Sequence, residues 1–253
     1  MRIVSLAPSN TEILYALGVG RDIVAVTAFC NYPESAKKKP KTGGWTSTQV
    51  LTVKKFNPDI VFTSTFLQDH IVKELNGNNI KVVHVDPKTL DDVFKSIQTI
   101  GKAIGKENLA KQLIYKIKTE IKSLQQYYFD RVGRNRKRVY IEEWHEPPMV
   151  SGNWVPGIVK LAGGKYDLIR EGEISRKITL EEIKKYDPEI IILSLCGYGF
   201  RPSPDIISKR KGWEQISAVK NKKVYVFDDD YLNRPGPRLV LGLKQLVKII
   251  HEN

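Results

Sequence analysis

Two nine-residue stretches decide how this chain folds. Residues 54–62 read KKFNPDIVF, and residues 184–192 read KKYDPEIII. Each joins the end of a helical segment to an Asn-Pro or Asp-Pro turn and then to an apolar, largely β-branched run that is typical of a buried strand. Because the same pattern occurs once in each half of the chain, the sequence predicts two similar α/β lobes.

Other strand-like runs surround these two stretches, and helical segments separate them. They are residues 2–6, 22–27, 60–63 and 82–85 in the first half, and 138–142, 190–194 and 223–227 in the second. Strands that alternate with helices favour parallel sheets with crossover helices. Capping boxes are expected at Ser9 with Glu12 and at Thr179 with Glu182, each opening a helix.

A long helix is predicted between the two halves. From residue 106 to residue 129, neither Gly nor Pro occurs, and apolar side chains recur every three or four residues at Leu109, Leu113, Ile117, Ile121 and Leu124. A helix of this length extends about 36 Å. The sequence therefore predicts a first lobe over residues 1–95, a helical region over 96–130 that holds a stiff connecting helix, and a second lobe over 131–253.

The charge of the chain has two interpretations. Lys and Arg outnumber Asp and Glu by 41 to 28, which gives a formal net charge of +13. The basic runs 37–39 and 134–138 are compatible with a nucleic-acid-binding protein. Neither run is interleaved with aromatic residues, and no nucleic-acid-binding motif accompanies them. A solvated surface rich in Lys and Glu is favoured, with no nucleic acid as partner.

The sequence offers little for catalysis or for a resident metal. The chain has no G-x-S-x-G, H-E-x-x-H or P-loop motif, so an enzyme is not expected. His145 has Glu neighbours, but their spacing matches no zinc pattern, and no metal or intrinsic cofactor is expected. Cys30 and Cys196 also lack metal-ligand spacing, and free thiols are favoured.

Localisation is left open by the residues themselves. No stretch approaches the roughly 18–20 apolar residues that cross a bilayer. The chain starts directly with a strand-like run and shows no secretory signal. Either the protein is cytoplasmic or a targeting segment precedes the given sequence.

Five short motifs together resemble one protein family. They are residues 2–14 (RIVSLAPSNTEIL), 31–33 (NYP), 57–61 (NPDIV), 151–154 (SGNW) and 234–238 (RPGPR). In this order they resemble the ABC-transporter substrate-binding proteins for vitamin B12 and iron complexes, and most of all the vitamin B12-binding members. The resemblance implies two Rossmann-like lobes with central, mainly parallel sheets, joined by one long backbone helix, with a corrinoid (cobalamin or cobinamide) bound in a cleft between the lobes. It also implies a monomer that works outside the cytoplasm with an ABC permease at the membrane surface.

The residues that the resemblance assigns to ligand binding follow predicted strands or open helices. They are Ser9, Asn10, Tyr32, Trp45 and Phe66 in the first lobe, and Trp144, Trp154, Tyr198, Tyr231 and Arg234 in the second. A corrin ring offers a broad face for aromatic contacts and peripheral amides for hydrogen bonds. Arg234 has an alternative role, which is to neutralise the acidic run 228–230. Trp154 equally suits a packing role at the start of a helix.

Two positions relate to docking on a permease. Glu181 matches an acidic residue that family members present from the second lobe. The first-lobe counterpart falls at Leu51, which departs from the family pattern. A second departure is the lack of the second-lobe cysteine pair that some vitamin B12 receptors carry.

Other ligands compete with corrinoids within the same family. Ferric siderophores, haem and oxyanions are the alternatives, with cationic side chains expected around a siderophore and a Tyr or His axial ligand expected for haem. The matched positions here are mainly aromatic, which favours a corrinoid.

Overall fold

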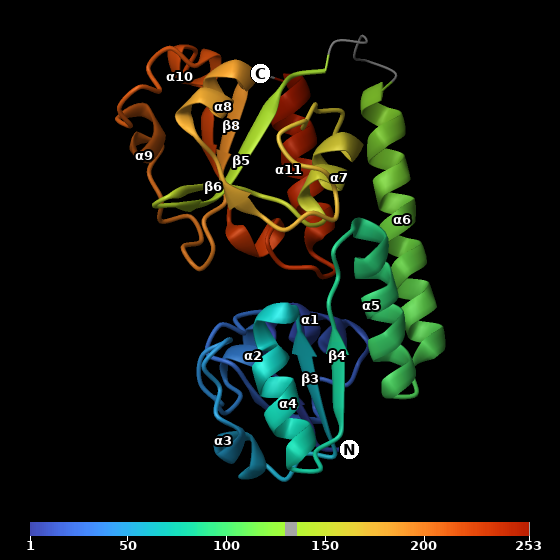
Figure 1. The fold of residues 1–253 in the computed structure, drawn as a ribbon. Helices are drawn as coiled ribbons and strands as arrows, with labels where there is room; N and C mark the ends of the chain where they lie inside the picture. Colours follow the sequence, from blue (N-terminus) through green and yellow to red (C-terminus); the bar gives the residue numbers. More distant parts are fainter. Residues whose placement is uncertain (130–135, 253) are drawn as a thin grey trace. The chain divides into compact units, whose positions relative to one another are not determined.

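The computed structural model describes residues 1–129 and 136–252, and these form two compact units. The first unit comprises Met1–Pro87 and Asp91–Lys116, and the second comprises Lys88–Leu90 and Ile117–Asn253. Each unit is an α/β structure built on its own mainly parallel sheet (Figure 1). The expected fold class is therefore confirmed.

The first unit contains a parallel sheet in the order β2-β1-β3-β4. Its strands are β1 (Ile3–Ser5), β2 (Ile23–Val26), β3 (Ile60–Ser64) and β4 (Val82–Val85), and its helical segments before α6 are α1 (Pro8–Ala16), α2 (Glu34–Lys37), α3 (Val50–Lys54), η1 (Phe66–Gln68), α4 (Asp69–Gly77) and α5 (Leu90–Ala103). The strands β1 and β3 are buried along their whole length, because helices cover both faces of the sheet.

The second unit contains a mixed sheet in the order β7-β6-β5-β8-β9. Strands β5, β8 and β9 run parallel, and β6 and β7 pair antiparallel at one edge. The elements are β5 (Val139–His145), β6 (Pro148–Val150), α7 (Val155–Leu161), β7 (Arg176–Lys177), α8 (Leu180–Tyr186), β8 (Ile190–Leu193), α9 (Asp205–Ser208), α10 (Ser217–Lys220), β9 (Val224–Val226), η2 (Asp229–Tyr231) and α11 (Leu239–Glu252). In Figure 1, α7 and α11 lie on one side of the sheet, and α8, α9 and α10 lie on the other.

The long helix α6 (Glu107–Phe129) contributes to both units, as expected of the connecting helix. It forms a helical hairpin with α5 in the first unit. A Cβ atom added at Gly101 would lie 2.5 Å from the side chain of Ala110, so glycine at this position lets α5 and α6 approach closely. The division between the units falls within α6, after Lys116, whereas the expected division kept the helix in a region of its own.

The repeated sequence pattern produces the same local structure in both units. Asn57 and Asp187 both adopt the left-handed conformation, with φ of 42° and 45°, at the turn that leads into β3 and β8. An arginine ahead of the central strand then bonds to this turn. The backbone N–H of Arg2 donates to Asp59 at 2.6 Å, and its side chain donates to the carbonyls of the turn.

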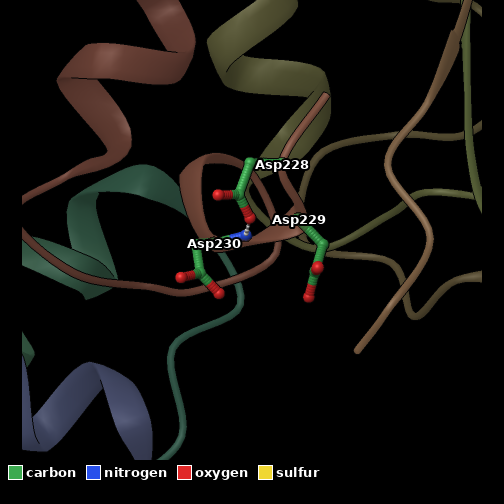
Figure 2. Close-up of side chains that lie close together, drawn as sticks. All are labelled: Asp228, Asp229 and Asp230. Carbon is green, nitrogen blue, oxygen red and sulfur yellow. Dashed lines mark hydrogen bonds between the residues drawn. The ribbon is translucent and has the colours of Figure 1, made fainter. Parts of the chain in front are cut away.

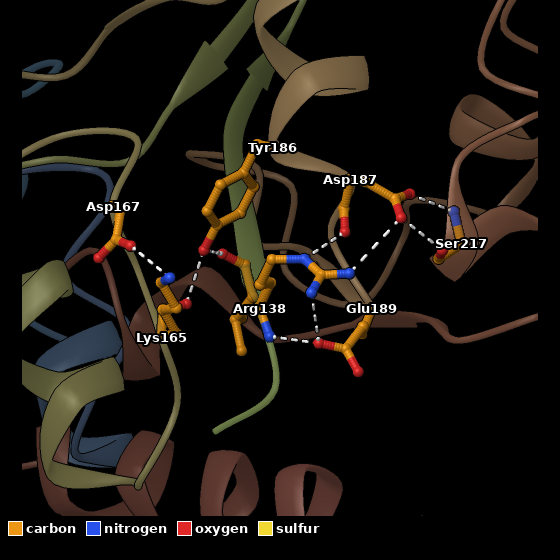
Figure 3. Close-up of polar contacts among 8 residues, drawn as sticks. Arg138, Lys165, Asp167, Tyr186, Asp187, Glu189 and Ser217 are labelled. Carbon is orange, nitrogen blue, oxygen red and sulfur yellow. Dashed lines mark hydrogen bonds and ion pairs between the residues drawn. The ribbon is translucent and has the colours of Figure 1, made fainter. Parts of the chain in front are cut away.

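In the second unit, Arg138 has the same role (Figure 3). Its backbone N–H donates to Glu189 at 2.9 Å, and its Nε donates to the carbonyl of Asp187 at 2.7 Å. The Asp187 carboxylate also accepts bonds from the N–H and hydroxyl of Ser217, which connects the turn to α10. These contacts lie at the amino end of the sheet, so they fix the strand register without occupying the carboxyl end.

One of the two expected capping boxes is confirmed and the other is wrong. Thr179 and Glu182 form both bonds of the motif at the start of α8. In contrast, α1 begins at Pro8 and its N-cap residue is Ala7, which places Ser9 inside the helix. Proline is favoured in the first turn because its missing N–H would have no partner there.

Both cysteines are free thiols, as expected. Within the described residues, none of the helices combines the length and the apolar character that a membrane crossing requires.

A buried ion pair fixes the α9 segment to the central strand β5. The Glu142 carboxylate is fully buried, and both of its oxygens accept bonds of 2.7 Å from the Arg210 guanidinium. One of them also accepts a bond from the hydroxyl of Tyr140, and the guanidinium lies 4.5 Å from the centre of the Trp213 ring. Removal of one partner would leave an unpaired charge in the interior.

We therefore expect Arg210→Leu to destabilise the second unit by about 3–5 kcal/mol, because Glu142 would lose its counter-charge. The measurement is urea unfolding followed by circular dichroism. Lys209→Ala is the matched control, since Lys209 forms an exposed pair with Asp205 and its loss should cost less than about 1 kcal/mol. Equal destabilisation by both variants would contradict this assignment.

Candidate functional site

An aromatic cluster forms at the carboxyl end of the second sheet. Strands β5 and β8 are parallel neighbours, so the residues that end β5 lie beside the loop that follows β8. The ring centres of Trp144 and Tyr198 are 6.4 Å apart, and those of His145 and Tyr198 are 5.7 Å apart, both in edge-on geometry. Trp144 is 40% exposed, and Arg201 lies over the Tyr198 ring at 5.6 Å. The cluster offers an accessible aromatic surface of the kind that contacts a flat ligand.

His145 in this cluster belongs to no group of three or more possible metal-ligating side chains within the described residues. A metal-bound imidazole usually donates its second N–H to a carbonyl or carboxylate. The Nδ1 atom of His145 is buried and has no hydrogen-bond partner among the described residues. An imidazole protonated on Nε2 suits this position best, because Nδ1 then carries no unsatisfied donor.

The acidic run after β9 resembles a metal site at first sight. One carboxylate oxygen from each of Asp228, Asp229 and Asp230 lies within 4.8 Å of the others (Figure 2). Each side chain nevertheless has protein partners. Asp228 accepts the N–H of Asp230, Asp229 accepts two backbone N–H groups, and Asp230 pairs with two arginines. Each carboxylate of the run therefore has at least one protein partner.

The structure favours the alternative role for Arg234. Its side chain is mostly buried and pairs with Asp230, as does Arg238 at 3.1 Å. Arg238 also lies 5.4 Å from the centre of the Tyr231 ring, which is itself half-buried. The Arg234 guanidinium thus forms an ion pair with the acidic run, and its contact with a ligand stays a prediction.

Trp154 has a packing role in its unit. It is 5% exposed, and its indole N–H donates to the carbonyl of Leu232 at 2.8 Å. It joins the start of α7 to the segment after η2 and leaves almost no surface for a ligand.

The expected first-lobe residues gather around the carboxyl ends of β1 and β3. Ser9 and Asn10 are buried in the first turn of α1, where the amide of Asn10 donates to the carbonyl of Thr63 at 2.9 Å. Tyr32 and Phe66 are exposed on loops, and Trp45 is half-buried. Tyr32 and Phe66 thus present accessible rings, whereas Ser9 and Asn10 are buried, and Asn10 connects α1 to β3.

Gln68 is a functional candidate that sequence reasoning missed. Its side chain is fully buried and donates to the carbonyls of Leu6 and Trp45, at 2.8 and 2.7 Å, while it accepts the N–H of Ser64 at 2.7 Å. One amide thereby joins two strand ends to the Trp45 loop. No local sequence signal marks this role, because the partners are far apart in the chain.

Polar atoms without partners occur in the same region. The Trp45 indole nitrogen and the hydroxyls of Ser64 and Thr65 are buried and have no hydrogen-bond partner within the described part of the chain. Thr65 also has φ of 66°, which is uncommon for a β-branched residue. Strain and unpaired polar groups often mark ligand sites. Phe29, 51% exposed after β2, is a further aromatic that the sequence analysis passed over.

The two positions considered for docking are both accessible. Glu181 is exposed in the first turn of α8, whereas the neighbouring Glu182 pairs with Arg176 at 2.8 Å. Leu51 is 71% exposed on α3. Docking at Glu181 stays a prediction, and Leu51 stays a departure from the family pattern. Of the basic run 134–138, Arg134 and Asn135 lie outside the described residues.

Comparisons of the sequence with known proteins identify the family of this chain. The family model for periplasmic binding proteins matches residues 3–231. An uncharacterized ABC transporter substrate-binding lipoprotein of Bacillus subtilis, YvrC, is 33% identical over 99% of this chain and 80% of its own. A vitamin B12-binding protein of Pectobacterium carotovorum is 27% identical over 97% of this chain and 86% of its own.

Solved structures show the same fold. A possible iron-binding, periplasmic solute-binding protein of Staphylococcus epidermidis superimposes with a TM-score of 0.83 at 29% identity, covering 99% of this chain and 98% of that one. The haem-binding protein BhuT superimposes with a TM-score of 0.86 at 19% identity, with coverage of 99% and 98%. The chain belongs to the periplasmic binding protein family, whose members bind solutes for ABC-type import.

Glu143, at the carboxyl end of β5, gives a pH-dependent prediction. Burial raises the pKa of this carboxyl group, while hydrogen bonds from Ser175 and Ser151 oppose the rise. A raised pKa means that the folded state favours the neutral acid. The contribution of Glu143 to stability is therefore greatest at acidic pH and is lost as the pH rises through the raised pKa.

We expect Glu143→Gln to raise the melting temperature at pH 7 by about 2–4 °C and to change it much less at pH 4, where Glu143 is largely neutral. Thermal unfolding of the two proteins at both pH values tests this. Glu146→Gln, at an exposed position nearby, should have little effect at either pH. A stabilisation that is equal at pH 4 and pH 7 would count against burial as the cause.

Proposed function

We propose that this protein captures a corrinoid, cobalamin or cobinamide, for an ABC importer. The observation that carries the proposal is the set of accessible aromatic rings at the carboxyl ends of the strands in both units. Ligands of open parallel sheets bind at this end. Tyr32 and Phe66 supply the rings in the first unit, and Trp144 and Tyr198 supply them in the second.

The chemistry of these residues suits a corrinoid better than the other candidate ligands. A corrin macrocycle needs broad apolar contacts together with hydrogen bonds to peripheral amides. The hydroxyls of Ser64 and Thr65 and the Trp45 indole N–H are buried and have no hydrogen-bond partner within the described residues, so they would donate such bonds only to a ligand that reaches beneath the surface. Arg234 and Arg238, which an anionic siderophore or oxyanion would need, already pair with Asp230. The vitamin B12-binding relative supports the same choice.

Haem or a ferric chelate is the second candidate, and a specific observation favours it. Tyr32 is 48% exposed and Tyr198 stands in the aromatic cluster, so a phenolate ligand for ferric iron is available. The possible iron-binding protein of Staphylococcus epidermidis and the haem-binding protein BhuT agree with this alternative. His145 contributes less to it, because its Nδ1 lacks a supporting acceptor.

The partner and location follow from the family. We propose a monomer that works outside the cytoplasm and delivers its ligand to a permease, with Glu181 as one contact point. The lipoprotein name of the Bacillus subtilis relative supports this location, and the family gives no support to a cytoplasmic role. Neither catalysis nor binding of nucleic acid is part of the proposal, and weak binding to heparin that salt removes would be consistent with it.

Isothermal titration calorimetry with cyanocobalamin, dicyanocobinamide, ferric haem, a ferric siderophore and molybdate tests the choice of ligand. We expect saturable one-to-one binding of the corrinoids, together with quenching of tryptophan fluorescence, because Trp144 lies in the proposed site. Binding of haem or the siderophore with no response to corrinoids would overturn the corrinoid assignment and favour the second candidate.

A variant pair tests the location of the site. Trp144→Ala should weaken cyanocobalamin binding by about tenfold, the equivalent of about 1.4 kcal/mol, because a ligand-facing aromatic surface is lost. Tyr115→Ala is the control, since Tyr115 is an exposed aromatic on α6 and follows no strand. Titration by fluorescence or calorimetry compares them. If Trp144→Ala binds as tightly as the control, the cluster does not contact the ligand.

A further inference from the structure

The loop that presents Tyr198 has an unusual backbone. It follows β8, and both of its glycines have positive φ, 80° at Gly197 and 57° at Gly199. Glycine adopts such values readily, but it also loses the most conformational entropy on ordering. A loop of this composition needs specific contacts to hold one conformation.

Asp229 supplies these contacts from the short helix η2, which follows the neighbouring strand β9. Its carboxylate accepts the N–H of Gly197 at 2.8 Å through Oδ2 and the N–H of Gly199 at 2.7 Å through Oδ1. Asp229 is buried and lies in η2, directly after β9, which pairs with β8. The Asp229 carboxylate thereby bonds to the loop on both sides of Tyr198 and connects the carboxyl ends of two adjacent strands.

Arg201 adds further contacts from within the loop. The Arg201 side chain donates to the carbonyls of Tyr198 and Gly197, at 2.9 and 2.6 Å, and its guanidinium covers the Tyr198 ring. Together, the bonds from Asp229 and Arg201 restrict the conformation of the loop backbone. The Tyr198 ring is therefore held edge-on to Trp144 and His145 before any ligand arrives.

The neighbouring aspartates do not share this role. Figure 2 shows the carboxylate of Asp229 pointing to a different side of the turn from that of Asp230. Asp228 accepts the N–H of Asp230, and Asp230 pairs with Arg234 and Arg238. Position 229 is thus the member of the run that reaches the loop.

We propose that Asp229 is a positioning residue of the ligand site, which holds Tyr198 in the orientation that contacts a flat macrocycle. This inference rests on the proposed function, because it requires that Tyr198 contacts the ligand. Its physical basis is preorganisation: a loop ordered in advance loses less freedom on binding. The role requires a carboxylate, because two acceptor oxygens are needed for the two N–H groups.

The first test compares Asp229→Asn with Asp228→Asn. An asparagine at 229 keeps the shape but replaces one acceptor with an NH₂ donor, so one glycine N–H loses its partner. We expect cyanocobalamin affinity to fall about tenfold in Asp229→Asn, roughly the loss of one charge-assisted bond. Asp228→Asn retains an acceptor for Asp230 and should bind like the wild type. Equal affinity in all three proteins would overturn the inference.

A double-mutant cycle separates positioning from general destabilisation. In a Tyr198→Ala background, Asp229→Asn should cause no further loss of affinity, because the ring that Asp229 positions is already absent. A further tenfold loss in that background would show that Asp229 acts on the fold in general, and the inference would fail.

A ligand-free measurement keeps this inference distinct from the proposed function. Amide hydrogen exchange at Gly197 and Gly199, followed by NMR, should be at least about tenfold faster in Asp229→Asn than in the wild type or in Asp228→Asn. Unchanged exchange would show that Asp229 does not hold the loop. If exchange accelerates but the wild type binds no macrocycle, the proposed function fails and the ligand-positioning role fails with it.

Discussion

The structure depends on the pairing of one central strand with the strand that follows the repeated Pro turn. In the first unit, β1 pairs with β3 in the register Ile3 to Ile60, and in the second, β5 pairs with β8 in the register Val139 to Ile190. An arginine ahead of each central strand bonds to the left-handed turn and so sets this register from the amino end. Because parallel strands all end at the same edge, the register also decides which loops meet at the carboxyl end.

The amino and carboxyl ends of each sheet carry different kinds of side chains. Polar contacts at the amino end, such as the bonds of Arg138 to its turn, hold the backbone together. At the carboxyl end, accessible aromatic rings are supported from beneath by buried polar side chains, Gln68 in the first unit and Asp229 in the second. Gln68 and Asp229 each connect segments that are distant in the sequence. Both side chains are buried, so their polar atoms need hydrogen-bond partners.

Family membership and local chemistry constrain the function at different levels. The family establishes a solute-binding protein, and relatives with different ligands share its fold. Selection among ligands depends on the few side chains at the strand ends. Among these side chains, Arg234 pairs with Asp230, and the rings of Trp144 and Tyr198 lie edge-on to one another. Leu51 presents an exposed apolar side chain on α3.

The sequence by itself determined the features that are local or periodic. The repeated Pro turns, the apolar spacing of α6 and the capping box at Thr179 each depend on residues within a few positions of one another, so their outcome could be predicted. The sequence likewise predicted that Trp144 and Tyr198 lie near the ends of strands. The start of α1 was misjudged, because Pro8 competed with Ser9 for the first turn.

Only the tertiary structure decided which polar and aromatic side chains are buried or paired and which stay exposed. Trp154 donates its N–H to Leu232, 78 positions away, and Gly197 is held by Asp229, 32 positions away. No local pattern reports such contacts, because they arise when parallel strands bring distant loops to one edge. Trp154 is buried and Arg234 pairs with Asp230. Asp229 bonds to the loop after β8, which its place in an acidic run does not indicate.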